Sequence, residues 1–385
     1  MNILVISYYY GYAASGIISE RVVNSLARNG CSIKVISSSP EKQRYNSESV
    51  QYICVPHIIS ENSFLFRLLK LIIGSLFIRA YNFWWRKNTE KTALKIVKEW
   101  GPEWLYCRST PIDACIIGEN LRNKTGIKVL QHFTDPVPSP LDKNDINRRR
   151  LLDLTNSILK GANLISFGNE AMFNYSKSIR DFNFAEKVFI SPDPAVSSNI
   201  TMMPQKQRDD IVLLYLGNIT GSRNPIPLLS VISKMRKTYP VVLWMSCNKP
   251  LLPSNDLSLK YPFVKYLGTT DSVLSVISES NYLVDLDGDD DIPVFISSKL
   301  KDYLLSNRPI LSITPSNSPS AFLLKDLKTV FVTRNTETCI SNALTKMIEN
   351  VFLDDAFKER CNVIKMFNPD NVACNIISKL NDYEA

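Results

Sequence analysis

The chain is poor in the residues that build most metal and redox sites. It has only two histidines, His57 and His132, which argues against a metal site made of imidazole ligands. Its eight cysteines include no Cys-x-x-Cys pair, so neither a zinc ribbon nor a redox motif is expected, and we interpret them as free thiols in a reducing cytoplasm. No Gly-x-Gly-x-x-Gly follows the first apolar run of either half, which disfavours a nicotinamide-dependent dehydrogenase.

The chain also lacks an uninterrupted apolar run of the ~20 residues that a membrane-spanning helix requires. Segment 64–87 comes nearest, but Arg67, Lys70 and Arg79 interrupt it. Drawn as a helix, the segment has most of its apolar side chains on one side and its basic side chains on the other. It is therefore either a helix that lies in the headgroup plane of an anionic membrane or a core-packing helix with a solvated face. Residues 2–7 resemble a strand rather than a signal peptide, so no signal peptide is expected.

Negative charge is scarce in the first half of the chain. The net charge is +8; residues 1–200 hold 25 Lys and Arg against 17 Asp and Glu, whereas the two kinds balance in residues 201–385. A basic half favours an anionic partner, either a phosphorylated substrate or an acidic lipid surface. No nucleic-acid-binding module is recognisable, so we expect no nucleic acid partner.

Short apolar runs alternate with helical patterns along the chain. Runs without polar alternation are typical of strands buried on both faces of a parallel sheet. The predicted strands are 2–7, 33–36, 104–107, 127–133 and 163–167 in the first half and 211–216, 241–246, 264–266, 282–286 and 310–313 in the second. A polar, proline-containing stretch at 191–210 interrupts the rhythm and predicts a linker. The expected fold class is α/β with two Rossmann-like domains.

The richest motif lies at the start of a predicted helix over 298–306. Ser297 and Ser298 occupy a good N-cap position, and free amides at a helix start bind phosphate. Lys299 opposes the helix dipole, so an anionic ligand would explain its presence. Asp302, one turn later, has a carboxylate that can accept hydrogen bonds from ribose hydroxyls. The alternative is a capped surface helix with an ion pair between residues three apart.

A second motif follows the predicted strand 211–216. The strand ends at Gly217, and Arg223 stands just before the next predicted helix, where it can reach a diphosphate bound over the strand ends. A basic residue at a helix start is common, so this motif indicates a diphosphate site only in combination with the first motif.

In their order and spacing, the two motifs resemble those of retaining glycosyltransferases of the GT-B fold, family 4 (group 1) type. Gly217 and Arg223 match a strand, a glycine, a short turn and a basic residue before a helix. Residues 298–303, followed by Arg308-Pro309-Ile310, match the family stretch Ser-Lys-Leu-x-Glu-Tyr with a proline and a strand behind it.

The chain departs from the family pattern at three positions. Many members carry two glutamates eight positions apart, and here these positions hold Val294 and Asp302. Many carry an arginine directly after the glycine, where this chain has Asn218. Diphosphate binding would therefore depend on Arg223, Lys299 and helix amides, with no metal ion or other cofactor.

The resemblance implies a GT-B architecture with an interdomain cleft. The implied domains are an acceptor-binding domain with the basic helix, a nucleotide-sugar-binding domain and a final helix that crosses back to the first domain: residues 1–195, 196–368 and 369–385. The implied donor-binding residues are Gly16, Gly217, Asn218, Arg223, Ser297, Ser298, Lys299, Leu300 and Asp302. Arg223 and Lys299 would also be catalytic, because they would stabilise the departing diphosphate.

The first half supplies candidate residues for an acceptor. Gly11 and a Ser15-Gly16 turn resemble the first glycine loop of the family. His132 and Asp135 lie at and just after the end of the predicted strand 127–133, and strand ends of open α/β sheets face the ligand crevice. Both are candidate catalytic residues that orient or deprotonate an acceptor hydroxyl. The alternatives are a core histidine and an aspartate in a capped turn.

Asp285 and Asp287 form an Asp-x-Asp pair that resembles manganese and calcium motifs. A calcium loop requires a glutamate where this chain has Ile296. We therefore interpret residues 285–291 as a strand end followed by a solvated acidic loop, and we expect no metal site.

The expected function is transfer of a sugar, with retention, from a nucleotide diphosphate sugar, UDP-linked, to a lipid-linked saccharide of O-antigen or capsule synthesis. The expected location is the cytoplasmic face of a bacterial inner membrane, on its anionic surface. Two alternatives stay open. A nucleotide-sugar 2-epimerase on the same fold would need no membrane helix, and a non-catalytic peripheral scaffold of polysaccharide assembly would account for the missing first glutamate.

Overall fold

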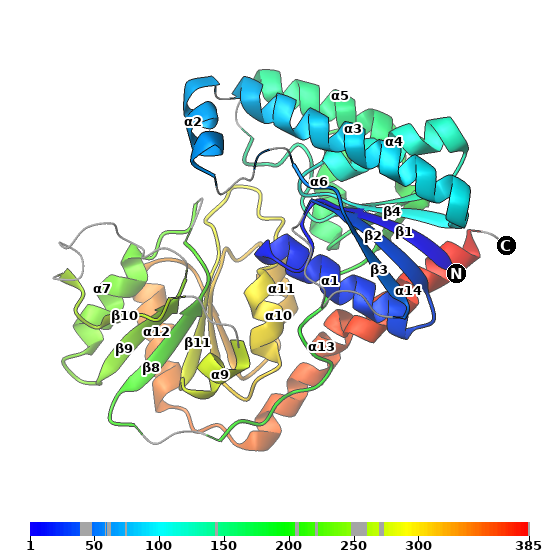
Figure 1. Cartoon of the computed structure of the whole chain (residues 1–385). Helices are drawn as coiled ribbons and strands as arrows, with labels where there is room; N and C mark the ends of the chain where they lie inside the picture. The colour runs from blue at the N-terminus through cyan, green and yellow to red at the C-terminus, as the bar shows by residue number, and fades with distance from the viewer. Residues whose placement is uncertain are drawn as a thin grey trace. The chain divides into compact units, whose positions relative to one another are not determined.

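The computed structural model divides the chain into two compact units, one formed by residues 1–194 and 369–385 and the other by residues 195–368 (Figure 1). The residues that it describes are 1–38, 48–57, 59, 63–73, 75–142, 145–204, 208–219, 222–247, 260–268 and 273–383, with the backbone alone at 73, 75–80 and 145.

The first unit is built on a seven-stranded sheet in the order β3-β2-β1-β4-β5-β6-β7, and every pair of neighbours is parallel. The strands are β1 (Asn2–Ser7), β2 (Ser32–Ser37), β3 (Val50–Cys54), β4 (Trp104–Arg108), β5 (Lys128–Phe133), β6 (Leu164–Phe167) and β7 (Val188–Ile190). The helices are α1 (Ala13–Arg28), α2 (Phe64–Ile73), α3 (Ser75–Trp100), α4 (Asp113–Thr125), α5 (Asp145–Gly161), α6 (Glu170–Ser178), the short η2 (Ala185–Lys187) and α14 (Pro369–Asp382).

The second unit repeats this plan with six parallel strands in the order β10-β9-β8-β11-β12-β13. The strands are β8 (Ile211–Leu216), β9 (Val241–Ser246), β10 (Val264–Tyr266), β11 (Tyr282–Leu286), β12 (Ile310–Ile313) and β13 (Val330–Thr333). The helices are α7 (Ile226–Met235), α9 (Val273–Ser278), α10 (Ser298–Leu304), α11 (Pro319–Leu324), α12 (Glu337–Glu349), η3 (Asp354–Arg360) and α13 (Cys361–Phe367). Two parallel-sheet α/β domains confirm the predicted fold class.

The last helix, α14, belongs to the first unit although the second unit precedes it in the chain. It packs against α1, and apolar side chains of both helices enter one core cluster beneath the first sheet. These side chains are Val22, Val23 and Leu26 of α1 and Val372, Ala373, Ile376 and Leu380 of α14. The first unit is thus completed by a segment from the other end of the sequence.

Segment 64–87 folds as two helices rather than the single helix that the sequence predicts. In the described chain α2 ends at Ile73 and α3 begins at Ser75. Phe66 of α2 packs edge-on against Tyr81 of α3, with 4.9 Å between ring centres, and both side chains are buried. Phe66 therefore faces the protein, as the core-packing alternative expects of an apolar side chain. In the described part of the chain, no helix combines the length and the apolar character needed to cross a bilayer.

The sequence prediction missed β3, β7 and β13, and all three are edge strands. Their burial is mixed, with half-buried or exposed residues between buried ones. Edge strands have a neighbour on one side only, so their residues need not form the continuous apolar runs by which the central strands are recognised.

Candidate functional site

Each sheet has one place where the strand order reverses, between β1 and β4 in the first unit and between β8 and β11 in the second. At such a place the loops leave neighbouring strands in opposite directions and open a crevice. Ligands of open α/β sheets bind there, beyond the carboxyl ends of the strands. The side chains around these two points are therefore the first candidates for a site.

At the second reversal, β8 ends in Gly217, whose backbone is left-handed with φ of 90°. A Cβ atom there would lie 3.4 Å from Cδ of Lys299, an ordinary contact distance, so the lysine passes close to the strand end and it is the backbone angle that favours glycine. Lys299 Nζ donates a hydrogen bond to the Tyr215 hydroxyl over 3.3 Å and lies 4.8 Å from the centre of that ring. The two predicted motifs, which are distant in sequence, therefore meet.

Arg223 and Ser297 each carry a buried polar atom without a hydrogen-bond partner among the described residues, Nε of the arginine and Oγ of the serine. Ser297 holds the N-cap position of α10, as predicted, but its side chain accepts no capping hydrogen bond. Because buried polar atoms are nearly always paired, unpaired ones beside a sheet reversal indicate a place for a polar ligand.

Asp285 and Asp287 are buried, which corrects the interpretation of residues 285–291 as solvated. Asp285 lies within β11 and is inaccessible, and Asp287 is 9% exposed. The Ser312 hydroxyl donates to Asp285 Oδ2 over 3.4 Å, and the Thr314 hydroxyl donates to Asp287 Oδ2 over 3.3 Å. The burial follows from the position of β11, which lies between β8 and β12 in the middle of the sheet. Only the later part of the acidic loop is exposed.

Burial and neighbouring charges shift the pKa values in this cluster. Burial lowers the pKa of Lys299 to about 8; Asp285 opposes the shift and Arg223 adds to it. Burial and the neighbouring Asp285 raise the pKa of Asp287 to about 6, and Arg223 opposes this shift. The four charges act on one another, yet no ion pair joins a cation to a carboxylate among them in the described part of the chain.

The other predicted donor residues of the second unit have different surroundings. Asp302 is buried, and one of its carboxylate oxygens accepts a hydrogen bond from the N–H of Val196 over 2.9 Å. Leu300 is fully buried in the core, so its side chain does not line the site. Ser298 is exposed at the start of α10. The carbonyl of Asn218 accepts a hydrogen bond from the hydroxyl of Tyr215 in β8 over 3.3 Å.

The first unit contains a buried polar network at its strand reversal that the sequence analysis missed. Arg108, the last residue of β4, is 2% exposed and forms an ion pair with Asp193 over 3.2 Å. It also donates to the hydroxyls of Tyr106 over 2.7 Å and Ser19 over 3.1 Å. The available signal was a charged residue directly after the apolar run 104–107.

His132 joins this network from β5. Its Nε2 lies 3.8 Å from Asp193 Oδ1, and its Nδ1 lies 2.9 Å from the Ser166 hydroxyl. At 1% exposure it fits the core-histidine interpretation, so it can position other groups. Asp135 lies closer to solvent and accepts a hydrogen bond from the Thr110 hydroxyl over 2.9 Å. Burial raises the pKa of Asp135, and the Thr110 hydroxyl opposes that shift.

Ser15 and Gly16 lie inside α1 and not in a turn before it, which corrects the prediction. A Cβ atom on Gly16 would lie 2.9 Å from the backbone nitrogen of Tyr10, closer than Cβ atoms come to such neighbours in proteins. Glycine at this position therefore lets α1 pack against the loop after β1. The Gly16 carbonyl also accepts a hydrogen bond from the N–H of Gly11 over 3.0 Å.

The second unit has cavities at both edges of its sheet. A cavity of about 410 Å³ lies at the carboxyl edge and is lined by the loops after β11, β12 and β13, including Asp287, Thr314 and Arg334. It adjoins the charged cluster, because Gly288 of its lining lies so close to Ser222 that a Cβ atom would overlap the serine hydroxyl. Among the described residues, no three His, Cys, Asp or Glu side chains are grouped to hold a metal ion.

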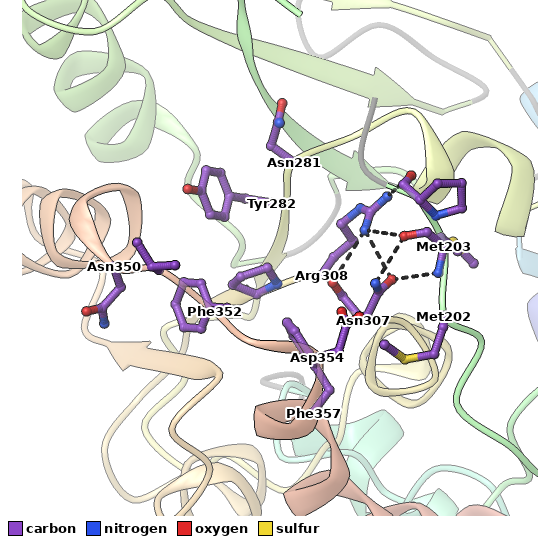
Figure 2. Close-up of a pocket in the computed structure, with 13 residues that line it drawn as sticks. Met202, Met203, Asn281, Tyr282, Asn307, Arg308, Asn350, Phe352, Asp354 and Phe357 are labelled. Carbon is purple, nitrogen blue, oxygen red and sulfur yellow. Dashed lines mark hydrogen bonds between the residues drawn. The ribbon is translucent and has the colours of Figure 1, made fainter. Parts of the chain in front are cut away.

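The other cavity, of about 450 Å³, lies at the amino ends of β11 and β12 (Figure 2). Figure 2 shows Arg308 turned toward Met203 and Asn307. Its guanidinium donates to carbonyl oxygens that include those of Met203 over 3.1 Å, Pro204 over 2.9 Å and Ser280 over 2.7 Å. The Arg308 guanidinium is thus held by backbone carbonyl groups, and this cavity lies at the amino ends of the strands, opposite to the ligand crevice. We therefore do not place the functional site there.

No family model and no curated protein matches the chain. Solved structures match it over nearly its whole length. A glycosyltransferase from Rickettsia africae shares 13% identity at a TM-score of 0.70, covering 100% of this chain and 98% of that one. Anabaena HepE in complex with UDP and glucose shares 12% at 0.69, covering 99% of both chains. The lipopolysaccharide outer core galactosyltransferase WaaB shares 12% at 0.65, also covering 99% of both.

UDP-GlcNAc 2-epimerases are among the similar structures as well. The enzyme from Neisseria meningitidis bound to UDP-GlcNAc shares 12% identity at a TM-score of 0.58, covering 99% of this chain and 100% of that one. The architecture of this chain is therefore the two-domain GT-B fold, which its structural neighbours among the glycosyltransferases and the UDP-GlcNAc 2-epimerases share. At these identities the likeness establishes the fold alone.

Proposed function

We propose that this protein is a glycosyltransferase that uses a nucleotide diphosphate sugar, UDP-linked, as its donor. The observation that carries the proposal is the pair of cations at the β8–β11 reversal. Arg223 and Lys299 approach the end of a central strand and form no ion pair in the described chain, so both are available to an anion. The structural neighbour HepE, solved in complex with UDP and glucose and with UDP-glucose, supports a UDP-sugar as that anion.

In the proposed reaction the bond between the anomeric carbon and the diphosphate breaks, and its electron pair goes to the diphosphate. Arg223 and Lys299 stabilise the charge that develops there, with Ser297 and Ser298 as further donors. Asp302, whose carboxylate accepts the N–H of Val196, is the proposed partner of the ribose. No metal ion or other cofactor is part of the proposal.

The acceptor oxygen forms the new bond as its proton leaves. We assign the proton to Asp135, whose raised pKa suits a proton acceptor, and a positioning role to the buried His132. We further propose that the acceptor is a lipid-linked saccharide of O-antigen or capsule synthesis and that the product retains the donor configuration. The likeness to WaaB, a lipopolysaccharide galactosyltransferase, supports this class of acceptor.

We also propose that the protein binds the cytoplasmic face of a membrane, and a surface of the first unit supports this proposal. We call it the α2–α3 face, and its exposed large apolar residues are Phe64, Leu65, Leu68, Leu71, Ile72, Phe83 and Trp84. Arg67, Lys70 and Lys87 are exposed among them, and residues 62–89 contain no Asp or Glu. An apolar face with basic charge and no acidic charge is complementary to an anionic bilayer surface.

The donor assignment is tested by thermal unfolding with UDP, GDP, ADP, CMP and their sugar conjugates. A ligand at 100 times its Kd adds about 2.7 kcal/mol of stability, which a raised Tm reports. Arg223→Ala should abolish the UDP shift and cripple sugar transfer, whereas Lys325→Ala, at an exposed position of the same unit, should leave both unchanged. Near-normal transfer by the Arg223 variant would refute the assignment.

Membrane binding is tested by flotation with vesicles of anionic phosphatidylglycerol and of neutral phosphatidylcholine. The protein should float with the anionic vesicles, and the double variant Leu71→Asp and Ile72→Asp should not. The double variant Val351→Asp and Leu353→Asp is the matched control, because these residues are 89% and 73% exposed and belong to the second unit. Equal flotation of both variants would contradict the proposed surface.

A nucleotide-sugar 2-epimerase is the second candidate, and the epimerases among the structural neighbours favour it. Incubation with UDP-GlcNAc and no acceptor separates the two, since an epimerase converts the sugar and a transferase does not. A protein that binds no nucleotide, with or without lipid, would instead be a scaffold of polysaccharide assembly.

A further inference from the structure

Two buried carboxylates lie beside the proposed diphosphate site, and one oxygen of Asp285 has no donor among the described residues. Asp285 accepts a hydrogen bond at Oδ2 from Ser312, while its Oδ1 has no hydrogen-bond partner in the described part of the chain. Asp287 accepts hydrogen bonds from the Thr314 hydroxyl and, over 3.0 Å, from the N–H of Gly288. A buried carboxylate with an unused oxygen costs free energy, so it indicates a missing partner.

The nearby cations do not supply that partner. Lys299 points its ammonium at the Tyr215 hydroxyl, and the buried Nε of Arg223 has no acceptor. The loops that carry these groups approach closely, since a Cβ atom on Gly288 would overlap the Ser222 hydroxyl. Positive and negative groups therefore lie together at the crevice without neutralising each other by contact, and of the two carboxylates Asp287 lines the cavity there. The chemistry of this crevice suits a ligand that has an anionic part and a part rich in hydrogen-bond donors.

Carboxylates accept hydrogen bonds and do not donate them when ionised, so their ligand must present O–H or N–H groups. The cations require phosphate, and a nucleotide diphosphate sugar presents sugar hydroxyls directly after its phosphates. We propose that Asp287, supported by the inaccessible Asp285 two residues before it, binds the hydroxyl groups of the donor sugar and so selects which sugar is transferred. This inference rests on the proposed function, because it assigns the sugar half of the same ligand. A bound cation fits less well, because Lys299 and Arg223 would repel it.

The test compares UDP with UDP-glucose, UDP-galactose and UDP-GlcNAc by titration calorimetry. In the variants Asp285→Asn and Asp287→Asn, the shape of the side chain is kept and the carboxylate charge is removed. The Kd of UDP should stay within about twofold, whereas the Kd of the preferred UDP-sugar should rise about tenfold or more, as expected for a lost hydrogen bond to a charged group. Asp291→Asn, on the exposed part of the loop, is the matched control and should change neither Kd.

The outcomes separate this inference from the proposed function. If the wild-type protein binds neither UDP nor any of the three UDP-sugars, both fail. If it binds them and the two variants weaken UDP and UDP-sugar equally, or change neither, the carboxylates serve only to balance Lys299 and Arg223, and the inference alone is overturned. Unfolding temperatures of the variants identify any loss of fold, and the less deeply buried Asp287 keeps the test decisive if Asp285→Asn does not fold.

Discussion

The lowered pKa of Lys299 predicts a pH-dependent affinity for nucleotide. Burial lowers the pKa of this ammonium to about 8, and a bound diphosphate would favour the charged form. Only the charged form attracts phosphate, and the apparent Kd equals the intrinsic Kd divided by the fraction of protein in that form. With a pKa of about 8 that fraction is roughly nine-tenths at pH 7 and one-tenth at pH 9. The Kd of UDP should therefore rise about tenfold between pH 7 and pH 9, with proton uptake on binding at the higher pH.

Titration calorimetry in buffers of different ionisation enthalpy measures both the Kd and the proton uptake. Lys299→Arg is the control, because arginine stays charged over this range, and its Kd should be nearly flat. Burial also raises the pKa of the neighbouring Tyr215, so the phenol stays neutral and does not contribute. An equal rise in Kd for the wild-type protein and the arginine variant would show that Lys299 is not the titrating group.

Three further substitutions test the framework around the site. Gly217→Ala should lower the free energy of unfolding by about 1 kcal/mol or more and weaken UDP binding, because alanine is unfavourable at a φ of 90° and relief of that strain would move the strand end beside Lys299; an unchanged Tm would contradict this. Arg360→Met should lower the free energy of unfolding, measured with denaturant, by about 3 kcal/mol or more. This buried guanidinium donates to several carbonyl groups that would lose their partner, and the Kd of UDP should not change. Asp193→Asn should lower the free energy of unfolding by about 3 kcal/mol, because Arg108 would be buried without its anion. A decrease below about 1 kcal/mol would show that the ion pair is dispensable for stability.

The central strands could be predicted from the sequence because burial on both faces leaves a local signature. The predicted strands 241–246, 282–286 and 310–313 coincide with β9, β11 and β12. The edge strands β3, β7 and β13 have no such signature, and the division of segment 64–87 between α2 and α3 was not predicted because the apolar pattern continues from one into the other. The local sequence pattern is enough to predict a strand that has neighbouring strands on both sides. It fails where the position of the strand in the sheet decides how much of its surface is buried.

The same distinction applies to the candidate site. Gly217, Arg223 and Lys299 could be found because strand ends and helix starts are marked in the sequence. The burial of Asp285 and Asp287 could not, since an acidic run has the composition of a solvated loop and only the position of β11 in the sheet covers it. The pairing of Arg108 with Asp193 joins residues 85 positions apart, and no local pattern reports such a contact.

The return of α14 to the first unit has a consequence for the order in which the protein matures during synthesis. The second unit is one continuous stretch of chain and can finish its core as soon as it has emerged from the ribosome. The first unit begins earlier but must wait for its last helix, and until then the apolar face of α1 lacks the cover of α14. The half that is translated first is therefore the half that folds last, and a chain truncated before residue 369 would leave this half incomplete and open to aggregation.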